Sequence, residues 1–204
     1  MILSHIKIIG SLVYRTRRAL RDNKDFLKGI DVYAFADNCF LNDELNLWHY
    51  PGTHNEISSV LRVIENPEFK FPALLNFQPV KQTISENETV VYYNLAFVAP
   101  VLKNWTTEQR EEQVFDKVLR TIYAEFMRQI SKCGYFVPFI GMPSHSMYEI
   151  FTTGKSSAQV MSTYGDHLDA IEIHNLKLTL NTSECNSRVQ KIDEENYLVT
   201  KNLT

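Results

Sequence analysis

The sequence predicts an α+β fold in which a mixed or antiparallel sheet packs against two long helices. Two stretches, residues 4–28 and 106–134, have the apolar spacing of helices, and extended apolar runs lie between and after them. Hydrophobic residues make up 44% of the 204-residue chain, which is enough to build the core of one domain. We therefore expect a single domain at 1–182, with insertions at about 37–68 and 134–165, and a C-terminal arm at 183–204.

The first helix is predicted over residues 4–28. Its apolar face recurs at steps of three and four residues, and comprises Ile2, Ile6, Ile9, Val13, Thr16 and Leu20. A basic row decorates the remaining surface: Arg15, Arg17, Arg18, Arg21 and Lys24. Such a row is typical of a solvated helix face. A second interpretation is that the basic row docks on an acidic surface of a neighbouring subunit. A third is that it contacts passing DNA.

The sheet is predicted from extended apolar runs. Residues 30–35 alternate as a strand does, and residues 57–64 are compatible with a short strand. The runs at 71–77 and 90–99 form a hairpin, joined by a polar connector at 81–88. The second run is apolar at odd and even positions, which is typical of a central strand covered on both faces. Pro72 belongs at the start or on an edge of its strand because it lacks a backbone donor, and Pro79 ends that strand.

The second helix, over residues 106–134, is the clearest element of the sequence. Thr106 and Gln109 have the spacing of a capping box, and Glu108, Glu111 and Glu112 lie where the helix dipole favours anions. Its buried face is expected to contain Phe115, Val118, Leu119, Ile122, Phe126 and Ile130.

The final strand is predicted over residues 170–180. Its apolar side chains occupy odd positions as far as Ile173 and even positions from Leu176 onwards. Because side chains alternate strictly along a strand, a change of phase by one residue indicates a β-bulge, here near His174 or Asn175.

The candidates for catalysis or ligand binding are weak. Residues 153–156 contain the Gly-Lys-Ser of a phosphate-binding loop, but Glu149 occupies the position of the required first glycine. A mobile loop is therefore favoured, while a small nucleotide- or metal-dependent enzyme using Lys155 is the alternative. Asp169, Glu172 and His174 lie close together in the sequence, but Asp169 has the opposite parity along the strand to Glu172 and His174 and so belongs to the other face. A solvated sheet face or a subunit contact therefore explains these side chains better than a metal site does. No catalytic residue, metal or cofactor is expected.

Composition narrows the cellular setting. Three scattered cysteines, Cys39, Cys133 and Cys185, favour a reducing environment. The net charge of −3 gives no general attraction to nucleic acid. No apolar run reaches the ~18 residues of a membrane span, and the N-terminus lacks the pattern of a signal peptide. We expect no membrane partner.

Several side chains are candidates for a protein–protein interface. Aromatic residues and arginines are enriched in interfaces, and the two insertions are long enough to reach a neighbour. The candidate interface residues are Arg15, Arg17, Arg18 and Arg21 in the first helix, Trp48 and Tyr50 in the first insertion, and Lys155 in the second.

The order helix, strand, long loop, hairpin, long helix and late strand resembles the tail-terminator and neck-ring proteins of tailed bacteriophages. The resemblance covers about residues 3–180. Segments 71–75, 90–97, the helix from 107 and 169–178 are similar to those of phages that infect gut Bacteroidales, including crAss-like phages. The two insertions depart from the family pattern.

The resemblance implies a structural virion protein with a tail-terminator-like fold and no enzymatic activity. Such a protein forms a homo-oligomeric ring between portal and tail, contacts neighbouring portal, neck and tail proteins, and surrounds DNA that passes without sequence recognition. It is assembled in the host cytoplasm and resides in the neck or tail of the virion.

Overall fold

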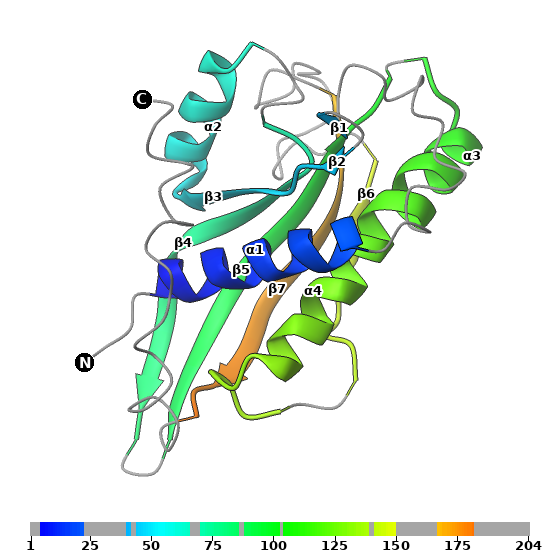
Figure 1. Ribbon diagram of the computed structural model, residues 1–204. Coiled ribbons are helices and arrows are strands. Elements are labelled where there is room, and N and C mark those ends of the chain that lie inside the picture. Colours follow the sequence, from blue (N-terminus) through cyan, green and yellow to red (C-terminus); the bar gives the residue numbers. More distant parts are fainter. Residues whose placement is uncertain are drawn as a thin grey trace.

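The computed structural model describes residues 5–22, 40–41, 44–65, 70–85, 88–102, 104–138, 141–149 and 167–181. Its centre is a five-stranded sheet in the order β3–β4–β5–β7–β6 (Figure 1). The strands are β3 (Trp48–Gly52), β4 (Ala73–Ile84), β5 (Thr89–Pro100), β6 (Ser146–Tyr148) and β7 (Leu168–Thr179). Strand β3 runs parallel to β4, and the other neighbours are antiparallel. The predicted α+β class with a mixed sheet is confirmed.

Three helical segments accompany the sheet: α1 (His5–Asp22), α2 (His54–Val63) and one continuous long helix. The long helix consists of α3 (Thr107–Arg110), the π-helical segment η2 (Glu111–Leu119) and α4 (Arg120–Lys132). In Figure 1, α1 crosses the front of the sheet and meets the long helix, whereas α2 lies beside β3. A short separate hairpin joins β1 (Phe40–Leu41) to β2 (Glu44–Leu45).

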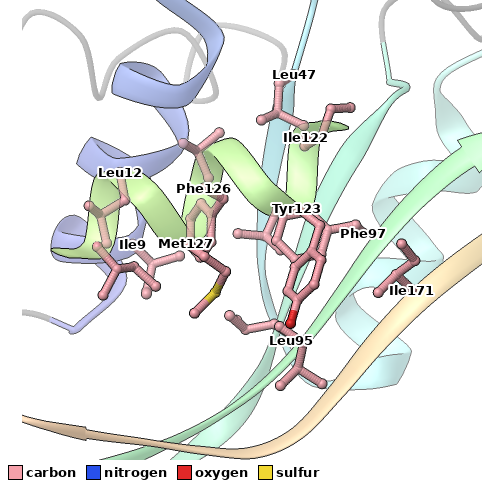
Figure 2. Packing of buried hydrophobic residues seen from close by; sticks show 14 of the residues in the cluster. Ile9, Leu12, Leu47, Leu95, Phe97, Ile122, Tyr123, Phe126, Met127 and Ile171 are labelled. Atoms are coloured by element: carbon pink, nitrogen blue, oxygen red, sulfur yellow. The ribbon is translucent and has the colours of Figure 1, made fainter. Parts of the chain in front are cut away.

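The larger core lies between the sheet and the layer formed by α1 and the long helix. Figure 2 shows Ile9 and Leu12 of α1 close to Phe126 of α4. The ring of Phe126 also packs edge-on against that of Phe97 in β5, with centroids 5.3 Å apart. Every residue of the predicted buried face of the second helix is buried. In α1, the predicted positions Ile9, Val13, Thr16 and Leu20 are buried as well.

A smaller core occupies the other face of the sheet under α2. Ile57 and Leu61 of α2 pack there with Phe71 and with Leu75 of β4. The prediction of a strand at 57–64 is wrong. A capping box starts a helix instead: Glu56 N donates to Thr53 Oγ1 at 3.4 Å, and Thr53 N donates to Glu56 Oε2 at 2.7 Å.

The predicted hairpin is confirmed and is longer than expected. Strand β5 is the third of the five strands, as predicted for a central strand. The polar connector at 81–88 is a wrong prediction, because β4 continues to Ile84 and β5 begins at Thr89, with Ser85 N donating to Glu88 O at 2.9 Å between them. Pro79 does not end β4. It lies where the register shifts between Phe77 and Lys81, so no ladder donor is required of it.

The predicted β-bulge in the last strand is confirmed. Tyr93 pairs with Leu176 and Leu95 with Ile173, so two residues of β7 face the single residue between them in β5. Asn175 has a positive φ of 53°, and its amide donates to Asn94 Oδ1 at 2.8 Å. The side-chain carbonyl of Asn94 therefore accepts a hydrogen bond from the backbone amide of Asn175, which has no partner in the strand ladder.

The two predicted insertions contain regular structure. Residues 37–68 include β3 and α2, and residues 134–165 include the edge strand β6. The predicted strand at 30–35, most of the second insertion and the arm at 183–204 lie outside the described residues.

Candidate interaction surfaces

The N-terminal half of the long helix presents carboxylates to solvent. The predicted capping box is present: Gln109 N donates to Thr106 Oγ1 at 3.3 Å, and Thr106 N donates to Gln109 Oε1 at 2.9 Å. Glu108 and Glu112 follow at a spacing of four residues, and both are exposed. Because the side chain of Glu112 is 66% exposed, its contact with a nearby lysine at 3.4 Å is open to water.

Arg120 ties this acidic part of the helix to strand β6. Its guanidinium contacts Glu111 at 2.5 Å and also contacts Asp116. Partial burial would lower the pKa of Arg120, but the hydrogen bonds and charges of the two carboxylates raise it above its ordinary value. The same guanidinium lies 3.4 Å from Met147 Sδ.

Strand β6 is the outermost strand on this side of the sheet and exposes apolar side chains. Met147 is 45% exposed and Tyr148 is 41% exposed. The following residue, Glu149, accepts a hydrogen bond from Thr107 Oγ1 at 3.3 Å, which places its carboxylate at the start of the long helix. We call this combined surface the acidic edge; it comprises Glu108, Glu112, Met147, Tyr148 and Glu149.

A buried ion pair fastens the long helix to the sheet behind the acidic edge. Arg110 Nη1 donates to Asp169 Oδ1 at 2.8 Å, and the two side chains are 5% and 0% exposed. Arg110 Nε also donates to the carbonyl of Trp105 at 3.3 Å. Since a buried charge is tolerated only with a partner, this pair fixes the start of the helix against β7.

The predicted basic row lies on α1. Arg15, Arg18 and Arg21 are exposed, and Arg17 is half-buried. The guanidinium of Arg15 lies 5.9 Å from the ring centre of Tyr135, a cation–π distance that holds it near the end of the long helix. Within the part of the chain that the structure describes, Arg15 and Arg18 form no ion pair. Their interface role stays a prediction.

The placement of Trp48 and Tyr50 in an interface loop is wrong. Both lie in β3, where Trp48 pairs with Ala73 and Tyr50 with Leu75 of β4. Trp48 is half-buried, and Tyr50 is only 8% exposed because its ring belongs to the core under α2. Burial raises the pKa of the Tyr50 hydroxyl. Lys155 lies outside the described residues.

Helix α2 forms a third surface. Its inner side packs on the smaller core, whereas Val60 and Val63 on its outer side are 47% and 80% exposed. Val60 and Val63 are three residues apart on the helix and so lie side by side, which makes the outer side of α2 a candidate contact surface.

Groups capable of chemistry are engaged in structural contacts. In the described ranges, no three His, Cys, Asp or Glu side chains are placed to hold a metal ion. Glu172 Oε2 lies 3.2 Å from His174 Nε2, whereas Asp169 pairs with Arg110 on the opposite face of the sheet. The Cys133 thiol donates to a backbone carbonyl at 3.0 Å, and burial raises its pKa.

Two further polar side chains, His49 and Asn76, are buried on the sheet face that packs against α1. Burial lowers the pKa of His49 to about 4, so its ring is neutral at pH 7. Among the described residues, His49 Nε2 and the side-chain amide of Asn76 have no hydrogen-bond partner. Both side chains lie within the protein interior, so they expose no acid or base to a substrate.

Three residues that build these surfaces, Arg110, Met147 and Tyr148, were not predicted from the sequence. Arg110 lies four and eight residues before Val114 and Val118, which places it on the buried face of the helix, and this spacing was a usable signal. Met147 and Tyr148 belong to a strand of three residues, too short to produce a periodic pattern.

No family model matches the chain, and no curated protein matches it. Across the described residues, the structure contains no helix of the length and apolar character needed to cross a bilayer.

Proposed function

We propose that this chain is a structural ring subunit of a bacteriophage neck or tail connector, with a tail-terminator-like fold. Copies of the chain assemble head to tail around the DNA conduit, and the ring joins the portal side of the head to the tail. The order of elements that resembles the tail-terminator and neck-ring proteins supports this proposal. So does the mixed sheet, which carries helices on both faces.

One observation carries the proposal: exposed apolar side chains lie at both outer edges of one sheet. Val60 and Val63 lie on α2 beside the edge strand β3, and Met147 and Tyr148 lie on the opposite edge strand β6. A ring needs a heterologous interface, in which one surface of each subunit contacts a different surface of the next. A protomer with distinct contact surfaces at opposite edges meets this requirement.

The interior of the protomer supports a scaffolding role. The buried Arg110–Asp169 pair fixes the long helix against β7, and the edge-on packing of Phe97 against Phe126 fixes it against β5. The capping boxes fix where α2 and the long helix begin. A rigid protomer lets a ring assemble with little loss of conformational entropy. The neighbouring portal, neck and tail proteins would contact the two flat sides of the ring, and DNA would pass through its centre without sequence recognition.

Electron microscopy of the purified chain and of the intact particle tests the proposal. We expect closed rings of one stoichiometry from the purified chain, and the same ring between head and tail in the particle. Light scattering at rising protein concentration gives the assembled mass independently. A chain that stays monomeric both alone and with its neighbouring neck proteins would refute the proposal.

Ligand titration addresses the competing enzyme hypothesis built on Lys155. A ligand that binds only the folded state raises the unfolding temperature. We expect no shift in that temperature with nucleotides, with divalent metals or with both together. A saturable stabilisation that disappears in Lys155→Ala would favour the enzyme instead.

A further inference from the structure

Charge is segregated between two surfaces of this protomer. Helix α1 is basic: it carries Lys7, Arg15, Arg17, Arg18 and Arg21 against the single acidic residue Asp22. The beginning of the long helix is acidic: Glu108, Glu112 and Asp116 are exposed, and Glu111 is half-buried. Arg110 is buried against Asp169 and does not offset them, whereas Lys117 contacts Glu112 and Arg120 contacts Glu111 and Asp116.

The acidic edge also carries apolar surface. Met147 and Tyr148 are exposed directly beside the helix, and the contact between Arg120 and Met147 holds strand and helix together. Glu111 and Asp116 are partly neutralised by Arg120, and Glu112 has an exposed contact with Lys117 at 3.4 Å. Because such an exposed pair is weak, Glu108 and Glu112 keep negative charge at the surface. The surface therefore combines apolar area with exposed negative charge, which suits a basic protein partner.

We propose that the acidic edge of one copy binds the basic face of α1, through Arg15 and Arg18, on the next copy of the chain. This inference rests on the proposed ring function and names the contact that joins its subunits, in which α1 rather than α2 receives the β6 edge of the next copy. Burial of Met147 and Tyr148 supplies affinity, and the opposite charges set orientation and exclude wrong partners.

The same pairing of surfaces is compatible with two symmetries. In a two-fold dimer the acidic edge of each copy would bind α1 of the other, so the contact would form twice. In a head-to-tail arrangement each copy uses its acidic edge on one neighbour and its α1 on the next, and a ring results when the rotation closes. The proposed ring function requires the second arrangement, and the assembled mass distinguishes the two.

Charge reversal on each surface tests the contact. We expect Arg15→Glu with Arg18→Glu to weaken assembly by about 100-fold or more, because attraction becomes repulsion. We expect Glu108→Lys with Glu112→Lys to weaken it similarly. The variant with all four substitutions should assemble again, since its reversed surfaces are complementary. Light scattering and electron microscopy measure the assembled mass and shape.

Mixing the two defective variants gives a sharper test. Each alone presents like charges at every contact, but in an equal mixture each variant offers the surface that the other needs. We expect rings of alternating composition, which native mass spectrometry resolves from rings of one variant. A two-fold contact would give heterodimers of the two variants and no larger species, and a nonspecific loss of solubility would give no mixed assembly.

Lys81→Glu with Lys177→Glu is the matched control. It makes the same change in net charge as the double arginine reversal, on exposed side chains of β4 and β7 away from both surfaces, and should assemble like the unaltered chain. Circular dichroism and thermal unfolding verify that every variant folds. This contact would be overturned, but not the ring, if either charge-reversed variant formed rings like those of the wild type. The same holds if the variant with all four substitutions folded but stayed monomeric. A wild-type chain that forms no ring alone or with its neck proteins would overturn both.

Discussion

Removing the carboxylate of Asp169 should strongly destabilise the protein. The Arg110–Asp169 pair is 2.8 Å long, and its side chains are 5% and 0% exposed, so solvent screening weakens it little. Asp169→Ala leaves a buried guanidinium without its counter-charge. Breaking such a pair costs about 3–5 kcal/mol of the free energy of unfolding. The helix that carries the acidic edge would lose its anchor on β7.

Urea unfolding at pH 7, followed by tryptophan fluorescence and circular dichroism, measures this effect. With a denaturant slope of about 1–3 kcal/mol per molar urea, the midpoint should fall by roughly 1–5 M. The melting temperature should fall by about 6–20 °C for a chain of this size. Trp105 is a suitable probe because its carbonyl accepts a hydrogen bond from Arg110.

A double-mutant cycle shows whether the loss comes from the pair itself. Arg110→Met combined with Asp169→Leu replaces both charges by apolar groups of similar size, and we expect it to be several kcal/mol more stable than the sum of the single changes. The reasoning is refuted if Asp169→Ala costs less than about 1 kcal/mol, or if the two changes are additive.

Three further predictions concern two helix N-termini and the β-bulge. Thr106→Ala should cost about 1 kcal/mol in urea unfolding, because the long helix loses its N-cap, whereas Thr106→Ser should retain it. The amide of Thr53 and, to a smaller extent, its hydroxyl lower the pKa of Glu56 below its ordinary 4.5. Its stabilisation of α2 is therefore complete above that pH and lost as pH falls through the lowered pKa. Hydrogen exchange of α2 should show this loss, and Glu56→Gln should abolish the pH dependence. In β7, Asn175→Gly should be tolerated, whereas Asn175→Val should cost at least about 1–2 kcal/mol by thermal unfolding, because only certain residues adopt a positive φ readily. A tolerated valine would contradict that account of the bulge.

Features determined by local pattern were predictable from the sequence. The long helix has a capping box at Thr106 and an apolar side chain every three or four residues, so its start and buried face both follow from neighbours in the chain. The bulge near Asn175 was predictable for a similar reason. A strand buried on one face cannot change phase without an extra residue, and Leu176 follows Ile173 by three positions.

Features determined by distant contacts were not predicted. The parallel pairing of Trp48 with Ala73 depends on α2 crossing between the two strands, and α2 itself was misread as a strand. Its apolar run is short, and short runs do not separate helix from strand by periodicity. The informative signal was the Thr53–Glu56 capping box, together with the spacing of Ile57, Leu61 and Ile64. In strand β4, Pro79 suggested that the strand ends there. The strand continues because Pro79 lies at a register shift, where no backbone donor is needed to bond the neighbouring strand.

The buried ion pair shows how a tertiary contact can be narrowed down from the sequence. A cation on the apolar face of a helix, as Arg110 is, implies a buried carboxylate elsewhere, because an unpaired buried charge costs too much. The final strand offers two carboxylates between apolar neighbours, Asp169 and Glu172. Parity distinguishes them: Asp169 shares its face with Ile171 and Ile173, which pack against the long helix, whereas Glu172 points to the other face. Asp169 is therefore the expected partner, and its Oδ1 lies 2.8 Å from Arg110 Nη1. A buried cation needs a carboxylate, and strand parity shows which carboxylate faces it. Together these two conditions identify the partner of Arg110, 59 residues away, whereas periodicity alone does not.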